Sequence, residues 1–136
     1  LVDIEKVLSN NGEPDRFFAV AIANTRSDFR LSKWDTGLTK SQVQTFVSAN
    51  PRYRARHIGY EGLGNQVRWN VILERTNEVS SAQIVFDYTN NGLINYANAS
   101  NKRIASLAFK RFNSTYAAIL VPSKTFTCTP GGPIGF

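Results

Sequence analysis

The chain has 136 residues, of which 42% are hydrophobic and 19% charged, and sixteen Lys and Arg against ten Asp and Glu give a net charge of +6. This length and apolar fraction fit one domain with a packed core and exclude wholesale disorder. A single cysteine and a single histidine exclude an internal disulfide framework, a zinc site of several thiolates and a His-rich metal site, and no apolar run approaches the roughly 18–20 residues of a membrane span. We therefore expect no cofactor, no metal and no membrane partner.

Three pairs of β-rich segments follow one another along the chain. The first members are residues 3–9, 54–60 and 103–109, and the second members are 18–22, 69–73 and 116–120. Polar turns at 10–14, 61–65 and 110–114 separate them, so the pattern predicts three β-hairpins. The second members are led by Phe18, Trp69 and Tyr116, and their alternate apolar residues form the expected core.

The segments between the hairpins also match, at an offset of 50 residues. After the candidate N-cap Thr39, Val43 and Phe46 recur at helical spacing, and Asn50-Pro51 ends the predicted helix. The second copy, 89–99, is also predicted to be helical, although Asn and Gly residues in its first turn weaken it. The residues before each helix are interpreted as loops.

These elements predict an α+β fold built from a repeat of about 50 residues. We expect the three hairpins to join edge to edge in one curved, half-barrel-like antiparallel sheet of about six strands, with both helices packed on one face. The expected domain covers residues 1–122, and the Pro- and Gly-containing residues 123–136 are interpreted as an extended tail or linker. The exposed first and last strands make an edge-to-edge homodimer a candidate assembly.

The absence of methionine and two N-x-S/T sequons bear on localisation. A chain that opens on Leu1 without any Met indicates an N-terminus made by cleavage. Asn98 and Asn113 are candidate N-glycosylation sites. Together these features predict a secreted, extracellular glycoprotein.

The repeated unit resembles a known family. Its spaced positions (Phe18, Trp34, Leu38, Tyr60, Trp69, Phe109 and Tyr116) are similar to the tandem repeats in the N-terminal half-barrel domain of fungal polyglycine hydrolases, the chitinase-modifying proteins, and to related bacterial repeats. The resemblance covers about residues 3–121. In that family the repeat domain precedes a β-lactamase-like serine hydrolase domain, which this sequence lacks.

No catalytic constellation is found. No Ser-x-x-Lys motif occurs, and Tyr96-Ala97-Asn98 matches a lactamase-type Tyr-x-Asn element without a nucleophile, so Tyr96 is interpreted as a core aromatic. His57 is the one candidate general base; we place it on a solvated strand face opposite Arg54, Arg56, Ile58 and Tyr60 and interpret it as structural. Cys128 lies in the tail and is a free thiol, a link to another chain or a stray residue.

Basic residues flank the second and third hairpins. The candidate ligand surface consists of Arg54, Arg56, Tyr60, Arg68, Arg103 and Arg111. This basic surface could bind a polyanion. The simpler interpretation is a solvated exterior of the sheet, in which the arginines pair with carboxylates such as Glu61, Glu74 and Asp3.

Three functional hypotheses follow from these features. The leading one is a secreted, non-catalytic recognition or scaffold domain that binds a protein or a cell-wall polymer. The second is an N-terminal accessory fragment of a secreted, polyglycine hydrolase-like serine hydrolase. The third, a basic nucleic-acid or membrane-surface binder, predicts salt-sensitive affinity, but no nucleic-acid-binding signature is present and no nucleic-acid partner is expected.

Overall fold

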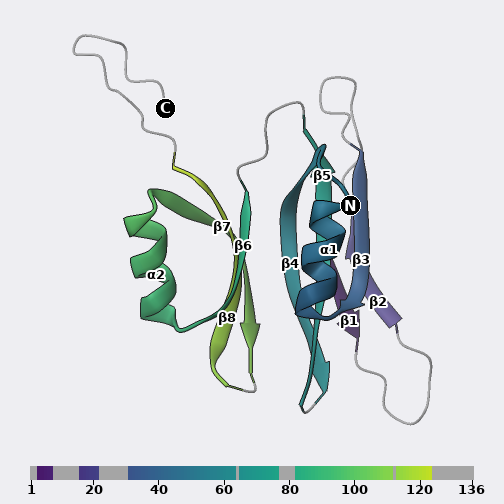
Figure 1. Ribbon diagram of the computed structural model, residues 1–136. Coiled ribbons are helices and arrows are strands. Elements are labelled where there is room, and N and C mark those ends of the chain that lie inside the picture. Colours follow the sequence, from purple (N-terminus) through teal and green to yellow (C-terminus); the bar gives the residue numbers. More distant parts are fainter. Residues whose placement is uncertain are drawn as a thin grey trace, which may run out of the picture.

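Antiparallel strands dominate the computed structural model, which describes residues 3–7, 16–21, 31–63, 65–76, 82–111 and 113–123 (Figure 1). The strands are β1 (Asp3–Val7), β2 (Arg16–Val20), β3 (Ser32–Leu38), β4 (Tyr53–Leu63), β5 (Gln66–Arg75), β6 (Gln83–Tyr88), β7 (Lys102–Lys110) and β8 (Thr115–Pro122), and the helices are α1 (Lys40–Ser48) and α2 (Asn90–Ala99). They form three small sheets, in the orders β1-β2, β3-β5-β4 and β6-β8-β7. The predicted α+β class is confirmed.

The predicted hairpins and helices are present. The pairs β1-β2, β4-β5 and β7-β8 are antiparallel. Helix α1 begins with a capping box in which Thr39 accepts from the Gln42 backbone, and α2 begins with Thr89 accepting from the Gly92 backbone. The weak first turn of α2 forms because its cap and its buried side chains Leu93 and Ala97 compensate for the low propensity of Asn and Gly.

Two strands occupy segments that the sequence analysis interpreted as loops. β3 precedes α1 and β6 precedes α2, so the order strand, helix, strand, strand occurs twice. Each of them pairs with the second strand of the following hairpin, which makes β5 and β8 the middle strands of their sheets. Register positions correspond between the two units: Trp69 lies between Leu38 and Tyr60, and Tyr116 lies between Tyr88 and Phe109.

The prediction of one continuous sheet with about six strands is wrong for the described residues, which contain eight strands in three sheets. The two larger sheets meet through β4 and β7, which are close in space but share no backbone ladder. At this junction the backbone N–H of Ile58 donates to the hydroxyl of Ser106 over 3.2 Å. A side chain therefore takes the place that a neighbouring backbone carbonyl would take in a continuous sheet.

The main core lies between these two sheets and includes α1. One buried cluster includes Val43 of α1, Val71 and Leu73 of β5, and Ala117 and Ile119 of β8. The other face of β8 packs Ala118 and Leu120 against α2, which lies on the outer side of its sheet in Figure 1. Each helix thus covers its own sheet. The predicted core residues of the second hairpin lie in the main core, whereas Ala118 and Leu120 of the third hairpin lie in the separate cluster under α2, so the expected single core is divided in two.

The first hairpin departs from the predicted core. Phe18 is 64% exposed and Val20 is also exposed, whereas Trp69 is 2% exposed. Of the described residues of β1, Ile4 is buried, because β1 lies against β4 and β5. No third strand pairs with β1-β2 within the described residues, so nothing there covers the side of β2 that carries Phe18. Residue Ile22, also predicted for the core, and the proposed tail after residue 123 lie outside the described residues.

The two tryptophans provide a matched test of the core. Trp69→Ala should lower the free energy of unfolding by about 3–5 kcal/mol, because the indole is buried between Tyr60 and Phe86. Trp34→Ala, which removes the same side chain from a 54% exposed position on β3, should change it by about 0.5 kcal/mol or less. Chemical denaturation monitored by circular dichroism measures both, and equal losses would contradict the core assignment.

A charged contact joins α1 to the second unit. Asp87 has a left-handed backbone (φ 63°) at an irregularity of β6, and its carboxylate contacts Lys40 at 3.3 Å and Lys110 at 3.2 Å. Burial alone would raise the pKa of Asp87, but hydrogen bonds and attraction from Lys110 and Lys40 outweigh it and lower the pKa. The ionised form is therefore stabilised by folding.

The pH dependence of stability tests this contact. Because the folded-state pKa of Asp87 lies below the ordinary value of 3.8, its stabilisation is complete above about pH 5 and is lost as the pH falls through the lowered pKa. Asp87→Asn should cost up to about 1 kcal/mol at pH 7, since the carboxylate is half exposed, and progressively less below pH 3.8. Urea unfolding at several pH values measures the difference; a difference that grows towards low pH would contradict this sign.

Candidate functional site

A cleft of about 430 Å³ opens beside the junction of β4 and β7. Its lining residues are Glu5, Ile58, Gly59, Tyr60, Glu61, Gly62, Leu107, Ala108, Phe109 and Arg111. The β7 wall is apolar and accessible, because Leu107 is 50% and Phe109 is 45% exposed. Acidic and basic groups stand in the same wall, so the cleft can contact apolar, charged and hydrogen-bonding groups of a ligand together.

Two of the six predicted ligand-surface residues line this cleft. Tyr60 is half-buried and packs edge-on against Trp69 with ring centroids 5.5 Å apart. Arg111 follows β7 and is exposed. Phe109, which the sequence analysis did not select, contacts Tyr116 at 5.0 Å and stands in the same wall. Its register match with Tyr60 was the signal that could have identified it.

Arg54 and Arg56 have a structural partner. Their guanidinium groups approach the two carboxylate oxygens of Glu74 at 3.7 Å and 2.8 Å, and the Glu74 side chain is only 6% exposed. A buried carboxylate needs compensating charge, which these two arginines supply. The pairing with Glu74 that the sequence analysis considered is confirmed.

The remaining two basic residues lie apart from this pair. Arg68 donates to the backbone carbonyl of Val67 over 2.9 Å. Arg103 is exposed and lies opposite Val121, at the register position that corresponds to Arg54 opposite Glu74. The six residues therefore divide between the cleft, the Glu74 pair and separate positions on β5 and β7.

Arginine substitutions distinguish structural from ligand-facing roles. Arg56→Ala should lower the free energy of unfolding by about 1–3 kcal/mol, because the buried Glu74 carboxylate loses its closer partner. Arg103→Ala removes the same group from the corresponding position opposite Val121 and should cost about 0.5 kcal/mol or less. Thermal and urea unfolding of both variants measure this difference. If Arg56→Ala has the same free energy of unfolding as the parent chain, Arg56 has no structural role.

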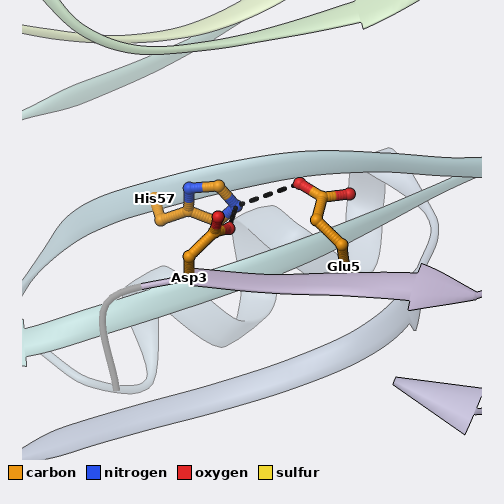
Figure 2. Close-up of side chains that lie close together, drawn as sticks. All are labelled: Asp3, Glu5 and His57. Atoms are coloured by element: carbon orange, nitrogen blue, oxygen red, sulfur yellow. Dashed lines mark ion pairs between the residues drawn. The ribbon is translucent and has the colours of Figure 1, made fainter. Parts of the chain in front are cut away.

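A second cluster lies where β1 approaches β4. Asp3 and Glu5 project from one face of β1 toward the imidazole of His57 on β4 (Figure 2). The Nε2 atom of His57 is 3.1 Å from Asp3 Oδ1 and 3.9 Å from Glu5 Oε1. These are a nitrogen and two carboxylate oxygens, a donor set that can hold a divalent metal ion.

Burial sets the protonation of this cluster. Desolvation lowers the pKa of His57, although attraction by Asp3 partly opposes it. Burial and repulsion by Asp3 raise the pKa of Glu5 above its ordinary value of 4.5. At neutral pH the imidazole is therefore mainly neutral, the form in which a ring nitrogen can act as a metal ligand.

The expected solvated face for His57 is corrected by this geometry. Its side chain is only 18% exposed, because β1 covers that side of β4. The register of β4 shifts between Ala55 and His57, so Arg56 is an extra residue and simple alternation fails there. Asp3 and Glu5 were not predicted as neighbours of His57; their i, i+2 spacing on one strand was the only local signal.

The remaining predicted positions are distributed over the surface. Asn98 is exposed on α2, and Asn113 is exposed in the turn before β8, where its Oδ1 accepts from the Thr115 hydroxyl. Tyr96 is half-buried in the α2 core, as predicted for a core aromatic. Cys128 lies outside the described residues.

Comparisons with known proteins give no family assignment: no family model, curated protein or solved structure matches the chain significantly. Neither of the two described helices, α1 and α2, has the length and hydrophobicity of a transmembrane helix.

Proposed function

We propose that this chain is a non-catalytic recognition domain that binds an extended segment of a protein ligand in the cleft between β4 and β7. The observation that carries the proposal is the accessible wall of Leu107 and Phe109 next to Tyr60 and Arg111. Aromatic residues and arginine are enriched at protein interfaces, and tyrosine and arginine are among the residues that contribute most to binding there.

The backbone of the cleft favours an extended ligand. β4 pairs only with β5, and β7 pairs only with β8, among the described residues. Both strands line the cleft without a common ladder, and the Ile58 N–H is taken by the Ser106 hydroxyl, so an extended peptide would lie along the strands and contact mainly their side chains. The side chains of such a peptide alternate, so some would contact the apolar β7 wall.

The charges of the cleft constrain the ligand further. The lining includes the acidic residues Glu5 and Glu61 and the basic residue Arg111. Such a mixed lining suits a segment with charges of both signs better than a uniform polyanion, so we favour a protein ligand over a nucleic acid or an acidic polymer. The pairing of Arg54 and Arg56 with Glu74 also leaves less free positive charge for a polyanion.

The proposal extends to the repeat and to localisation. We propose that the hairpin β1-β2 is a shortened copy of the two β-α-β-β units and that the three copies form a half-barrel whose concave surface contains the cleft. The matching registers of Trp69 and Tyr116 support this view. The resemblance to the repeat domain of fungal polyglycine hydrolases suggests a secreted domain that engages substrate for a hydrolase or acts alone.

Selection of displayed 12-residue peptides on the purified chain tests the proposed function. Binders should be enriched, and Phe109→Ala should weaken the best peptide about tenfold or more, since it removes an aromatic contact from the cleft. Ile94→Ala, an equally exposed apolar position on α2, is the matched control and should leave affinity unchanged. Glycine-rich peptides are included because of the family resemblance.

Folding and salt controls complete the experiment. Thermal unfolding must show that Phe109→Ala keeps the fold, because Phe109 also contacts Tyr116. Binders that tolerate Phe109→Ala, or a selection that enriches none, would overturn the proposal. Binding that disappears with added salt and transfers to any polyanion would favour the electrostatic alternative.

A further inference from the structure

The cluster of Asp3, Glu5 and His57 lies where β1 contacts β4, and the proposed binding of a peptide in the cleft gives it no role. Its donor atoms come from two separate hairpins, Asp3 and Glu5 from one and His57 from the other (Figure 2). The three ligand atoms all lie within 4.8 Å of one another. Two carboxylates and an imidazole thus meet at one point between the hairpins.

The distances between the atoms fit a shared ion. Ligand atoms that each lie about 2.1 Å from a zinc ion are about 3–3.5 Å apart when they are neighbours in its coordination shell. The separation between His57 Nε2 and Asp3 Oδ1 is 3.1 Å, and that to Glu5 Oε1 is 3.9 Å. Glu5 is half exposed, so a small rotation of its side chain can bring its oxygen into the same shell.

Two of the donor atoms are buried without a hydrogen bond. Asp3 Oδ1 and His57 Nε2 are both inaccessible to solvent; they face each other at 3.1 Å, and neither makes a hydrogen bond to the rest of the described residues. Buried polar atoms in this state are costly unless something satisfies them. A cation between a carboxylate oxygen and the lone pair of a neutral imidazole would satisfy both atoms at once.

Gly59 keeps the space between the donors open. A Cβ at this position would lie 3.2 Å from His57 Nε2 and 3.4 Å from Glu5 Oε1, and 3.6 Å from the backbone oxygen of Ile4. Gly59 therefore permits the close approach of β1 and leaves room beside both donor atoms. This observation is independent of the donor atoms themselves.

We propose that Asp3, Glu5 and His57 form a binding site for a divalent transition-metal ion of the Zn²⁺ class. One imidazole nitrogen with two carboxylates suits zinc, manganese, cobalt or ferrous iron better than calcium or magnesium, which prefer oxygen alone. Three protein ligands leave the remaining positions to water. The ion would also fasten the first hairpin to β4, because its ligands belong to both.

Titration of the metal-free chain with Zn²⁺, and with Co²⁺ as a spectroscopic probe, tests the site. The experiment uses the full chain with Cys128→Ser, so that the thiol cannot bind the metal. We expect one equivalent to bind, with a visible Co²⁺ spectrum and a higher unfolding temperature. His57→Ala and Asp3→Asn should each weaken binding about tenfold or more.

Two further variants test whether metal binding requires the space beside the donor atoms and these particular carboxylates. Gly59→Ala retains every donor atom but fills the space beside them, and should weaken binding to a similar extent. Asp35→Asn, which removes an exposed carboxylate from β3, should leave it unchanged. Absence of a one-to-one complex, or equal affinity in His57→Ala and the parent, would overturn the proposal. If one variant fails to fold, the remaining variants still test the metal site. None of these measurements depends on the peptide ligand, so the two proposals can fail separately.

Discussion

The contact of Trp69 with Phe86 holds the two larger units together, and the rest of the arrangement depends on it. Trp69 lies in the middle strand β5, and its ring meets Tyr60 of its own hairpin at 5.5 Å and Phe86 of β6 at 5.4 Å. The sheets share no backbone ladder within the described residues, so this apolar packing and the adjoining core set their relative position. That position in turn places β4 beside β7 and creates the cleft lined by Leu107 and Phe109.

The sequence predicted those parts of the fold that local patterns encode. Thr39 and Thr89 mark the helix starts, and hydrophobic alternation marks the hairpins. The strand β6 contains the apolar run Ile84-Val85-Phe86, which is typical of a strand, so its interpretation as a loop was avoidable. β3 offered no such signal, because Asp35, Gly37 and an exposed Trp34 are not typical of a strand interior. Its pairing with β5 is a tertiary effect.

The candidate sites were predictable only in part, for a similar reason. Tyr60 and Arg111 were selected from the sequence and line the cleft, but the apolar wall was assigned to no site. Arg56 is an extra residue in β4, so alternation between Arg54 and His57 fails. The imidazole is shielded from solvent because β1 covers the face of β4 on which it lies. The partners of His57 are more than fifty residues away in the sequence. Only the packing of the first hairpin on β4 brings Asp3 within 3.1 Å.

The cleft and the cluster share the side chain of Glu5 and adjoin at Gly59, and this links the two proposals physically. Glu5 lines the cleft and also faces His57, so a metal ion at the cluster would neutralise a negative charge in the cleft wall. The affinity of any ligand that contacts Glu5 would then depend on whether the metal is bound. By linkage, the affinity for the metal would change by the same factor when that ligand is bound. Substitution of Glu5 cannot separate the two sites. Phe109 belongs only to the cleft and His57 only to the cluster, so effects at these two positions are additive if the sites are independent and non-additive if Glu5 couples them.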